Sequence, residues 1–286
     1  MFESQSAGSR ASCRSSRLPL DLFSPVFDYS HVDGVGRARQ RNIEPRLDGQ
    51  TCRAGAVGPI VEFTNLATGE SLAELRRAPW FDVGSRRTLL DALTGTHHQW
   101  LQADGRCGML KDQGLAAEDK LRSFKIDAHK AALGASFGNA APLLVAAMGE
   151  LIGNVIDHSQ AEESGVAIFS ARAGLFEFVV ADRGIGVLRS LRQCPNYRTV
   201  ADEGAALAAM VETGVSRHGP NGGHGNGFRP IFERLADMTG QLRFRSGNYA
   251  LSLDGQFGDR IGRQLSQKPA LSGFFAAVLC RGPGQP

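Results

Sequence analysis

One stretch of the chain, residues 143–159 (LLVAAMGELIGNVIDHS), constrains the fold more than any other. Its apolar residues recur every three or four positions, as Leu144, Met148, Leu151 and Val155 illustrate. This spacing predicts a helix with a broad buried face, because positions three and four apart lie on the same side of a helix. We therefore expect a central helix here, around which the rest of the chain is organised.

Four polar residues of the same stretch share a second side of this helix. Glu150, Asn154, Asp157 and His158 stand at i, i+4, i+7 and i+8, a spacing that stacks them along one stripe. A carboxylate one turn from a carboxamide can hold a water molecule and a Mg²⁺ ion against a ligand that lies on the helix. The alternative is the solvated face of an ordinary amphipathic helix.

Two glycine-rich turns follow the central helix. The first comes directly after an apolar strand and reads Asp182-Arg183-Gly184-Ile185-Gly186, where a carboxylate can accept a hydrogen bond and the glycines let the backbone pass close to a flat ring. Its alternatives are an ordinary Asp-Gly turn or a dinucleotide fingerprint, but Arg189 stands where the fingerprint requires its third glycine.

The second turn, Gly225-Asn226-Gly227-Phe228, opens a helix. Its free backbone N–H groups and the positive helix end can cradle phosphate without a lysine. The P-loop motif Gly-x-x-x-x-Gly-Lys-Ser/Thr is absent from the sequence. These features predict a turn that binds phosphate through backbone amides and a helix N-terminus, without a P-loop lysine.

The ordered set Glu-x-x-x-Asn, Asp-x-Gly-x-Gly and Gly-x-Gly-Phe resembles the GHKL (Bergerat-fold) ATPases, which include gyrase-type topoisomerases, heat-shock chaperones, sensor histidine kinases, MutL proteins and anti-sigma serine kinases. The resemblance covers residues 117–282. It implies an α+β fold, a two-layer α/β sandwich in which helices cover one face of a mixed, mostly antiparallel sheet. It also implies ATP and Mg²⁺ as cofactors.

The resemblance assigns a role to each motif. It makes Glu150 the general base that activates water and Asn154 the Mg²⁺ ligand, and it places Asp182 on the adenine amino group. Residues 214–227 resemble the mobile ATP lid. The sequence departs from the family at Phe228, where leucine is usual, and at Asp157 and His158, which are typically lysine and tyrosine in sensor kinases. The nucleotide-binding residues implied are Asn154, Asp157, His158, Asp182, Gly184, Gly186, Gly225, Asn226, Gly227 and Phe228.

The rest of the chain is expected to follow a simple order. Residues 1–55 are predicted to form a disordered tail, residues 56–116 a small segment of unknown role, and residues 117–282 the ATP-binding domain. In the small segment, periodicity predicts a strand at 59–66 and helices at 71–77 and 85–93. In the domain, it predicts helices at 117–133, 143–159, 201–213 and 228–238, strands at 165–171, 175–181 and 273–280, and a hairpin of 241–246 with 249–254 around Gly247-Asn248.

Composition narrows the class of protein. The formal net charge of +3 over 286 residues indicates neither a nucleic acid nor a membrane surface as a partner. No apolar run approaches eighteen residues, which argues against a transmembrane helix. The five cysteines are scattered without a Cys-x-x-Cys pair, so we expect neither disulfides nor zinc, and a cytoplasmic location.

These observations predict an ATP-binding protein with Mg²⁺. Its function is expected to be an ATP-dependent switch, or a slow ATPase, that acts on a protein partner through residues 1–116. Two alternatives stay open: a protein kinase, either of the anti-sigma serine type or an orphan histidine kinase, and an interaction module that binds nucleotide without turnover. A His-Glu-x-x-x-Pro-like phosphoacceptor box does not precede the central helix.

Overall fold

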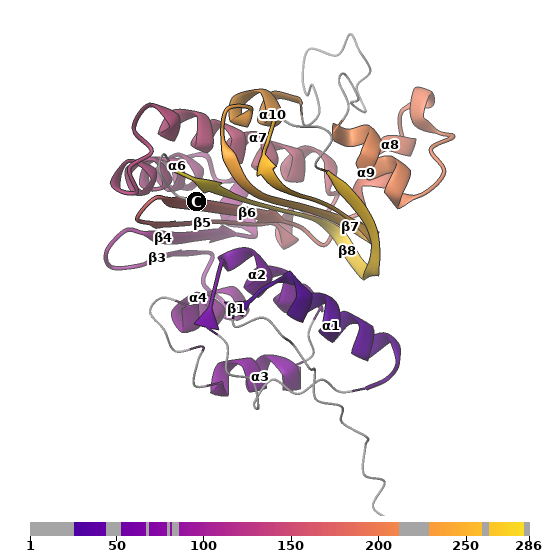
Figure 1. Cartoon of the computed structure of the whole chain (residues 1–286), viewed down its shortest axis with the longest axis horizontal. Coiled ribbons are helices and arrows are strands. Elements are labelled where there is room, and N and C mark those ends of the chain that lie inside the picture. Colours follow the sequence, from indigo (N-terminus) through magenta and orange to yellow (C-terminus); the bar gives the residue numbers. More distant parts are fainter. Residues whose placement is uncertain are drawn as a thin grey trace, which may run out of the picture.

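An antiparallel sheet of six strands forms the middle layer of the protein (Figure 1). The computed structural model describes residues 26–43, 53–66, 69–78, 81, 86–211, 229–258 and 263–282. The strand order is β3-β4-β5-β6-β8-β7. The strands are β3 (Gln99–Leu101), β4 (Cys107–Lys111), β5 (Val166–Arg172), β6 (Leu175–Ala181), β7 (Thr239–Gln256) and β8 (Gln264–Arg281).

Helices α6 (Glu118–Gly134), α7 (Ala141–His158) and α10 (Arg229–Leu235) cover one face of the sheet, and α7 contacts both of the others (Figure 1). The apolar side of α7 is buried with the inward side chains of β5, β6 and β8. By length and composition alone, the segment Gly138–His158 could cross a membrane. Most of its apolar residues instead belong to this core, and the central helix of a globular fold is expected to pass the same test.

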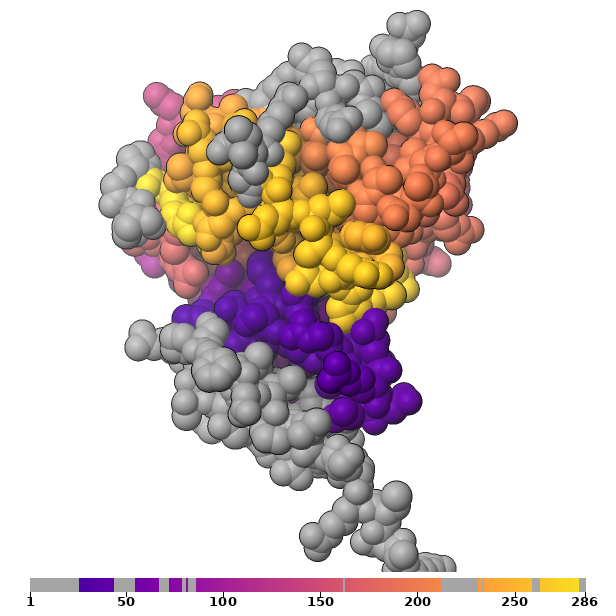
Figure 2. Space-filling model, turned by 45° about the vertical axis from the view of Figure 1, so that its right-hand side comes forward, coloured from indigo at the N-terminus to yellow at the C-terminus, as the bar shows by residue number. Residues whose placement is uncertain are grey.

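The N-terminal part of the chain covers the other face of the sheet (Figures 1 and 2). Side chains alternate along the strands: Phe178 and Val180 point to the α7 core, whereas Val179 and Ala181 point to a second core with α1, α2 and α4. The elements of this part are β1 (Val26–Phe27), α1 (Tyr29–Gln40), β2 (Arg53–Ala54), α2 (Val57–Leu66), α3 (Gly69–Arg77) and α4 (Arg86–Thr94).

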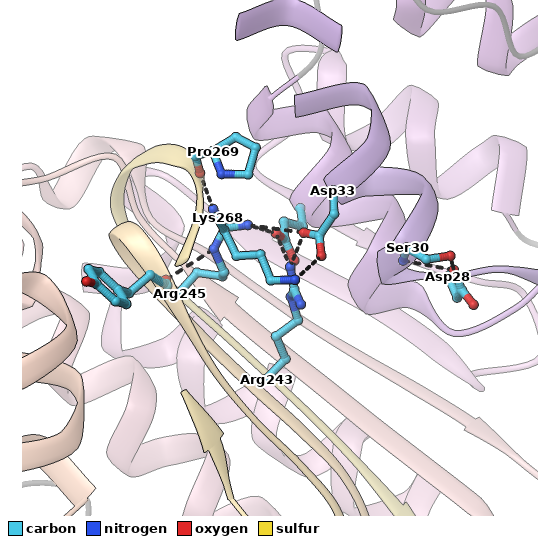
Figure 3. A network of polar contacts seen from close by, with 9 residues as sticks. Asp28, Ser30, Asp33, Arg243, Arg245, Lys268 and Pro269 are labelled. Atoms are coloured by element: carbon cyan, nitrogen blue, oxygen red, sulfur yellow. Dashed lines mark hydrogen bonds and ion pairs between the residues drawn. The ribbon is translucent and has the colours of Figure 1, made fainter. Parts of the chain in front are cut away.

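A buried ionic network fastens this layer to the sheet (Figure 3). Arg243 of β7 binds Glu62 of α2 through both carboxylate oxygens, at 2.8 and 3.0 Å, and its Nη2 lies 2.6 Å from Oδ1 of Asp33 in α1. Arg245 also binds Glu62, and Nζ of Lys268 lies 2.6 Å from Oδ2 of Asp33. Because Glu62 and Arg245 are fully buried, this network makes the N-terminal helices an integral layer of the fold.

The prediction that helices cover only one face of the sheet is therefore wrong for the described chain. The prediction of a tail over residues 1–55 is also wrong for part of its length, since α1 and β1 lie within it. Asp28 caps α1 by accepting a hydrogen bond from the backbone amide of Ser30 at 2.9 Å. The glycine at position 36, inside α1, is explained by Pro269. The side chain of Pro269 occupies the space that a Cβ at this position would need, with its Cγ at 2.7 Å.

The strand predicted at 59–66 is a helix, α2. Its pattern misleads because the helix is buried on nearly all sides, which leaves no polar face to mark its period. Its start carries no local cap either. The backbone amides of Val57 and Gly58 instead donate to the carboxylate of Glu177 in β6, at 2.6 and 2.7 Å.

The hairpin predicted around Gly247-Asn248 is also wrong, because β7 runs through both residues. Gly247 has a φ of +52° and lies at a register shift between β7 and β8, so the glycine serves a bulge. A Cβ there would lie 2.4 Å from Cγ of Glu203. The hairpin instead joins β7 to β8.

The structure confirms, within a few residues, the helices predicted at 71–77, 85–93, 117–133, 143–159 and 201–213 and the strands at 165–171, 175–181 and 273–280, although β8 begins earlier. The helix predicted at 228–238 is described from Arg229 and ends at Leu235, three residues before the predicted end. Strands β3 and β4 and helix α8 were not predicted. The remaining elements are α5 (Gln113–Ala116), α8 (Gly186–Arg192), α9 (Glu203–Val211) and the 3₁₀ turns Gly138–Ala140, Glu162–Ser164 and Pro195–Tyr197.

Candidate functional site

The polar stripe of α7 faces a groove between α6 and α7 with a volume of about 960 Å³. All four predicted residues of the stripe, Glu150, Asn154, Asp157 and His158, line it. Asp157 is exposed and the other three are half-buried. The spacing of these residues along the helix accounts for their common orientation.

Two glycines of α7 form part of the floor of this groove. A Cβ at Gly149 would lie 3.2 Å from Nζ of Lys125, so the lysine of α6 reaches across this glycine. A Cβ at Gly153 would meet no atom within 4 Å. The space above Gly153, next to Asn154, is therefore open.

Glu150 has an ionic partner on the helix that follows the second glycine-rich turn. Nη2 of Arg234 in α10 lies 3.3 Å from Oε1 of Glu150, and both side chains are about two-fifths exposed, at 36% and 41%. This pair ties the middle of α7 to α10. The carboxylate oxygen that contacts the guanidinium is not free to contact a water molecule at the same time.

The first glycine-rich turn meets the C-terminal end of α7 at Ser159. The backbone amide of Ile185 donates to the Ser159 carbonyl at 2.9 Å. A Cβ at Gly184 would lie only 2.0 Å from the same carbonyl oxygen, so any other residue at 184 would push the turn away from the helix. The contact joins the two motifs that sequence reasoning singled out separately.

Asp182 lies at the end of β6, where it is 4% exposed. Burial raises the pKa of its carboxyl from 3.8 to about 6, and hydrogen bonds from the backbone amides of Gly184 and Phe274 oppose that rise. The Gly184 amide lies 2.7 Å from Oδ1. A buried carboxylate with a raised pKa is costly in the absence of a ligand and is typical of a binding position.

The rest of the turn is held by β7 and β8. Gly186 has a φ of +74°, and a Cβ there would lie 2.9 Å from Oγ of Ser246, the same atom that accepts the backbone amide of Val187 at 2.9 Å. Gly273 of β8 also has a positive φ, and a Cβ there would lie 2.6 Å from Oδ1 of Asp182. The glycines of the turn are therefore required by close contacts.

Sequence reasoning missed several residues of this site. Ser159, Arg234 and Gly273 complete it through contacts between distant elements, and local periodicity carries no signal for such contacts. Lys125 was named only as part of a predicted helix. The one available signal was the pair Gly149 and Gly153, since glycine is unfavourable inside a helix and marks a position where something approaches closely.

The predicted phosphate-binding residues Gly225, Asn226, Gly227 and Phe228, and the lid predicted at residues 214–227, lie outside the described residues. The dinucleotide interpretation of the first turn has no support in the described sheet, because every pair of neighbours among its six strands is antiparallel, whereas that motif joins parallel strands.

The described residues contain no group of three or more His, Cys, Asp or Glu side chains that could hold a metal ion by themselves. Mg²⁺ does not need such a group, because it keeps several waters and is usually held by one or two protein oxygens together with substrate phosphates. Asn154 and Glu150 offer such oxygens on one wall of the groove.

Comparison with known proteins found no matching family model, no similar curated protein and no similar solved structure.

Proposed function

We propose that this chain is a Mg-ATP-binding protein with an ATP-binding domain of the GHKL (histidine kinase-like) type, acting in the cytoplasm as an ATP-dependent switch or slow ATPase on a protein partner. One observation carries the proposal: Ser159 joins the end of α7 to the Asp182–Gly186 turn. In this proposal the turn that holds the base lies against the end of the helix whose polar face holds the phosphates, although Asp182, Gly184 and Gly186 do not themselves line the α6–α7 groove.

Each described residue has a distinct task in this proposal. Asp182 accepts a hydrogen bond from the amino group of adenine, and Gly184 and Gly186 let the turn that holds this carboxylate pack against Ser159 and Ser246. Asn154 contributes its side-chain oxygen to Mg²⁺, with Asp157 and His158 beside the nucleotide. The metal ion, when bound, would neutralise phosphate charge.

The link to a protein partner is supported by the residue next to Asp182. Nε of Arg183 donates to Oδ1 of Asn65 in α2 at 3.3 Å, and the backbone amide of Arg183 donates to Oγ of Ser164 at 3.0 Å. The turn that would hold adenine thus touches the N-terminal layer directly. A displacement of the turn on nucleotide binding would reach α2 through this contact.

A second candidate, an interaction module that binds nucleotide without turnover, is favoured by the Glu150–Arg234 pair. If the pair persists when nucleotide is bound, Oε1 of Glu150 stays on Arg234 and is not free to contact the attacking water. Opening of the pair would release the carboxylate for hydrolysis. The two functions therefore differ in whether the Glu150–Arg234 pair stays closed or opens when nucleotide is bound.

The test is calorimetric titration of the full chain with ATP in the presence and absence of Mg²⁺, with Asp182→Asn as the variant. Loss of a hydrogen bond to a charged group costs about 1.5–3 kcal/mol, so the variant should bind about ten- to a hundred-fold more weakly. Asp119→Asn, at an exposed carboxylate of α6 that does not line the groove, is the control and should leave the affinity nearly unchanged. Equal affinity of Asp182→Asn and the parent protein would refute the adenine assignment.

A further inference from the structure

Charged side chains line the groove between α6 and α7, and not all of them have an ionic partner among the described residues. Ion pairs account for most of its charged side chains: Arg122 lies 3.3 Å from Glu118, Lys130 lies 3.9 Å from Asp127, and Glu150 is held by Arg234. Among the charged residues lining the groove, Lys125 and Asp157 form no ion pair with any residue that the structure describes. The charged residues that line it are Glu118, Arg122, Lys125, Lys130, Glu150 and Asp157.

Lys125 is positioned by the absence of a side chain on the facing helix. Its Nζ and Cε would lie 3.2 and 3.3 Å from a Cβ at Gly149, which is tighter than nearly all such contacts. The glycine therefore lets the half-buried lysine extend across α7. Its ammonium therefore lies close to Gly149, the residue before Glu150, and forms no ion pair with Glu118, Glu150 or Asp157, the carboxylates that line the groove.

The two ends of the site differ in chemistry. Asp182 and its turn meet α7 at Ser159, whereas Lys125 crosses α7 at Gly149, ten residues earlier and thus about 15 Å away along the helix axis. The Ser159 end offers a buried acceptor for a base. The Gly149 end offers a cation without an ionic partner, about one turn from the open backbone at Gly153, and a polyphosphate is stabilised by such a cation.

We propose that Lys125 binds the terminal phosphates of the nucleotide and makes the site selective for di- and triphosphates over nucleosides. This inference rests on the proposed function and deepens it. The carboxylates of Glu150 and Asp157 line the same groove and would repel a nucleoside triphosphate. A cation that no carboxylate has neutralised compensates for that repulsion.

The test compares the affinities of ATP, ADP and adenosine for the parent chain and for Lys125→Gln, measured by calorimetry with Mg²⁺. We expect Lys125→Gln to weaken ATP by about ten-fold or more, because it removes one hydrogen bond to a charged group. Adenosine should bind the variant and the parent equally, which also shows that the variant is folded. Lys125→Arg should keep most of the ATP affinity, since it retains the charge.

Lys130→Gln is the matched control, because Lys130 lines the same groove from the same helix but is paired with Asp127. It should change ATP affinity by less than about two-fold. If the parent chain binds ATP and Lys125→Gln binds it equally well, the assignment of Lys125 is wrong while the proposed function stands. If the parent chain binds neither ATP nor adenosine, the proposed function fails and the assignment of Lys125 fails with it.

Discussion

Asp182→Asn should stabilise the protein at neutral pH while it weakens nucleotide binding. In the folded chain, burial raises the pKa of the Asp182 carboxyl from 3.8 to about 6. The ionised form is therefore less favourable in the folded state than in the unfolded state. Because a pKa difference of one unit corresponds to about 1.36 kcal/mol, the cost of ionised Asp182 above pH 7 has an upper limit of roughly 3 kcal/mol.

The sign of the pH dependence follows from proton binding. Between pH 4 and pH 6 the folded state binds the proton of Asp182 more tightly than the unfolded state, so stability falls as the pH rises through this range. Asparagine has no charge to bury and can still accept hydrogen bonds from the amides of Gly184 and Phe274. These bonds are weaker to a neutral oxygen, so we expect a net gain of about 1–3 kcal/mol at pH 7.5 and little gain at pH 4.

Urea unfolding of the parent chain and of Asp182→Asn, at a series of pH values from 4 to 8, measures this difference. Asp157→Asn is the control, because Asp157 is exposed and its replacement should change stability by no more than about 0.5 kcal/mol at any pH. A gain for Asp182→Asn that does not grow with pH, or a loss of stability at pH 7.5, would refute the reasoning. The buried carboxylate would then be compensated within the fold and need no ligand.

Three further changes test other parts of the structure. Glu150→Ala should keep ATP affinity within a few-fold and, if Glu150 is the general base, lower phosphate release by about 10²–10⁴ in an assay with labelled ATP; hydrolysis at the parental rate would identify a module or kinase instead. Glu62→Ala should lower the free energy of unfolding by about 3–5 kcal/mol in urea titration, because it leaves Arg243 and Arg245 buried without their shared partner. The control is Asp91→Ala, which removes an exposed carboxylate 3.1 Å from Arg76 and should cost under about 1 kcal/mol. Gly184→Ala should lower the melting temperature because its Cβ would meet the Ser159 carbonyl at 2.0 Å, while Gly153→Ala, whose Cβ meets nothing, should raise that of the protein without ligand.

The parts of the fold that the sequence predicted are those with local signals. The period of α7 and the apolar runs of β5 and β6 can be recognised within one segment, because each element buries a regular set of its own residues. The apolar runs of β5 and β6 also contain a signal for the second helical layer, which the sequence analysis did not use. Strands with apolar residues on both sides are typical of a sheet covered on both faces, which is how the N-terminal layer packs.

The parts that could not be predicted depend on residues far apart in the chain. Helix α2 starts at a carboxylate supplied by Glu177, and α1 contains Gly36 because Pro269 lies against it. For the candidate site, the spacing of Glu150 and Asn154 was enough to place both on one groove. The partner of Glu150 on α10 could not be read from either segment, since nothing in a local pattern specifies which helix lies alongside.

The candidate site is where this chain departs most from the rules that stabilise a fold. Gly149 and Gly153 lie inside the central helix, where each costs about 1 kcal/mol relative to alanine, and Asp182 is a nearly fully buried carboxylate. Gly149 is explained by Lys125, but no protein atom occupies the space above Gly153. These departures lie along one side of α7 and at the turn that touches its end. A ligand that covers Gly153, accepts a hydrogen bond from Lys125 and donates one to Asp182 would account for the open space above Gly153 and for the buried carboxylate.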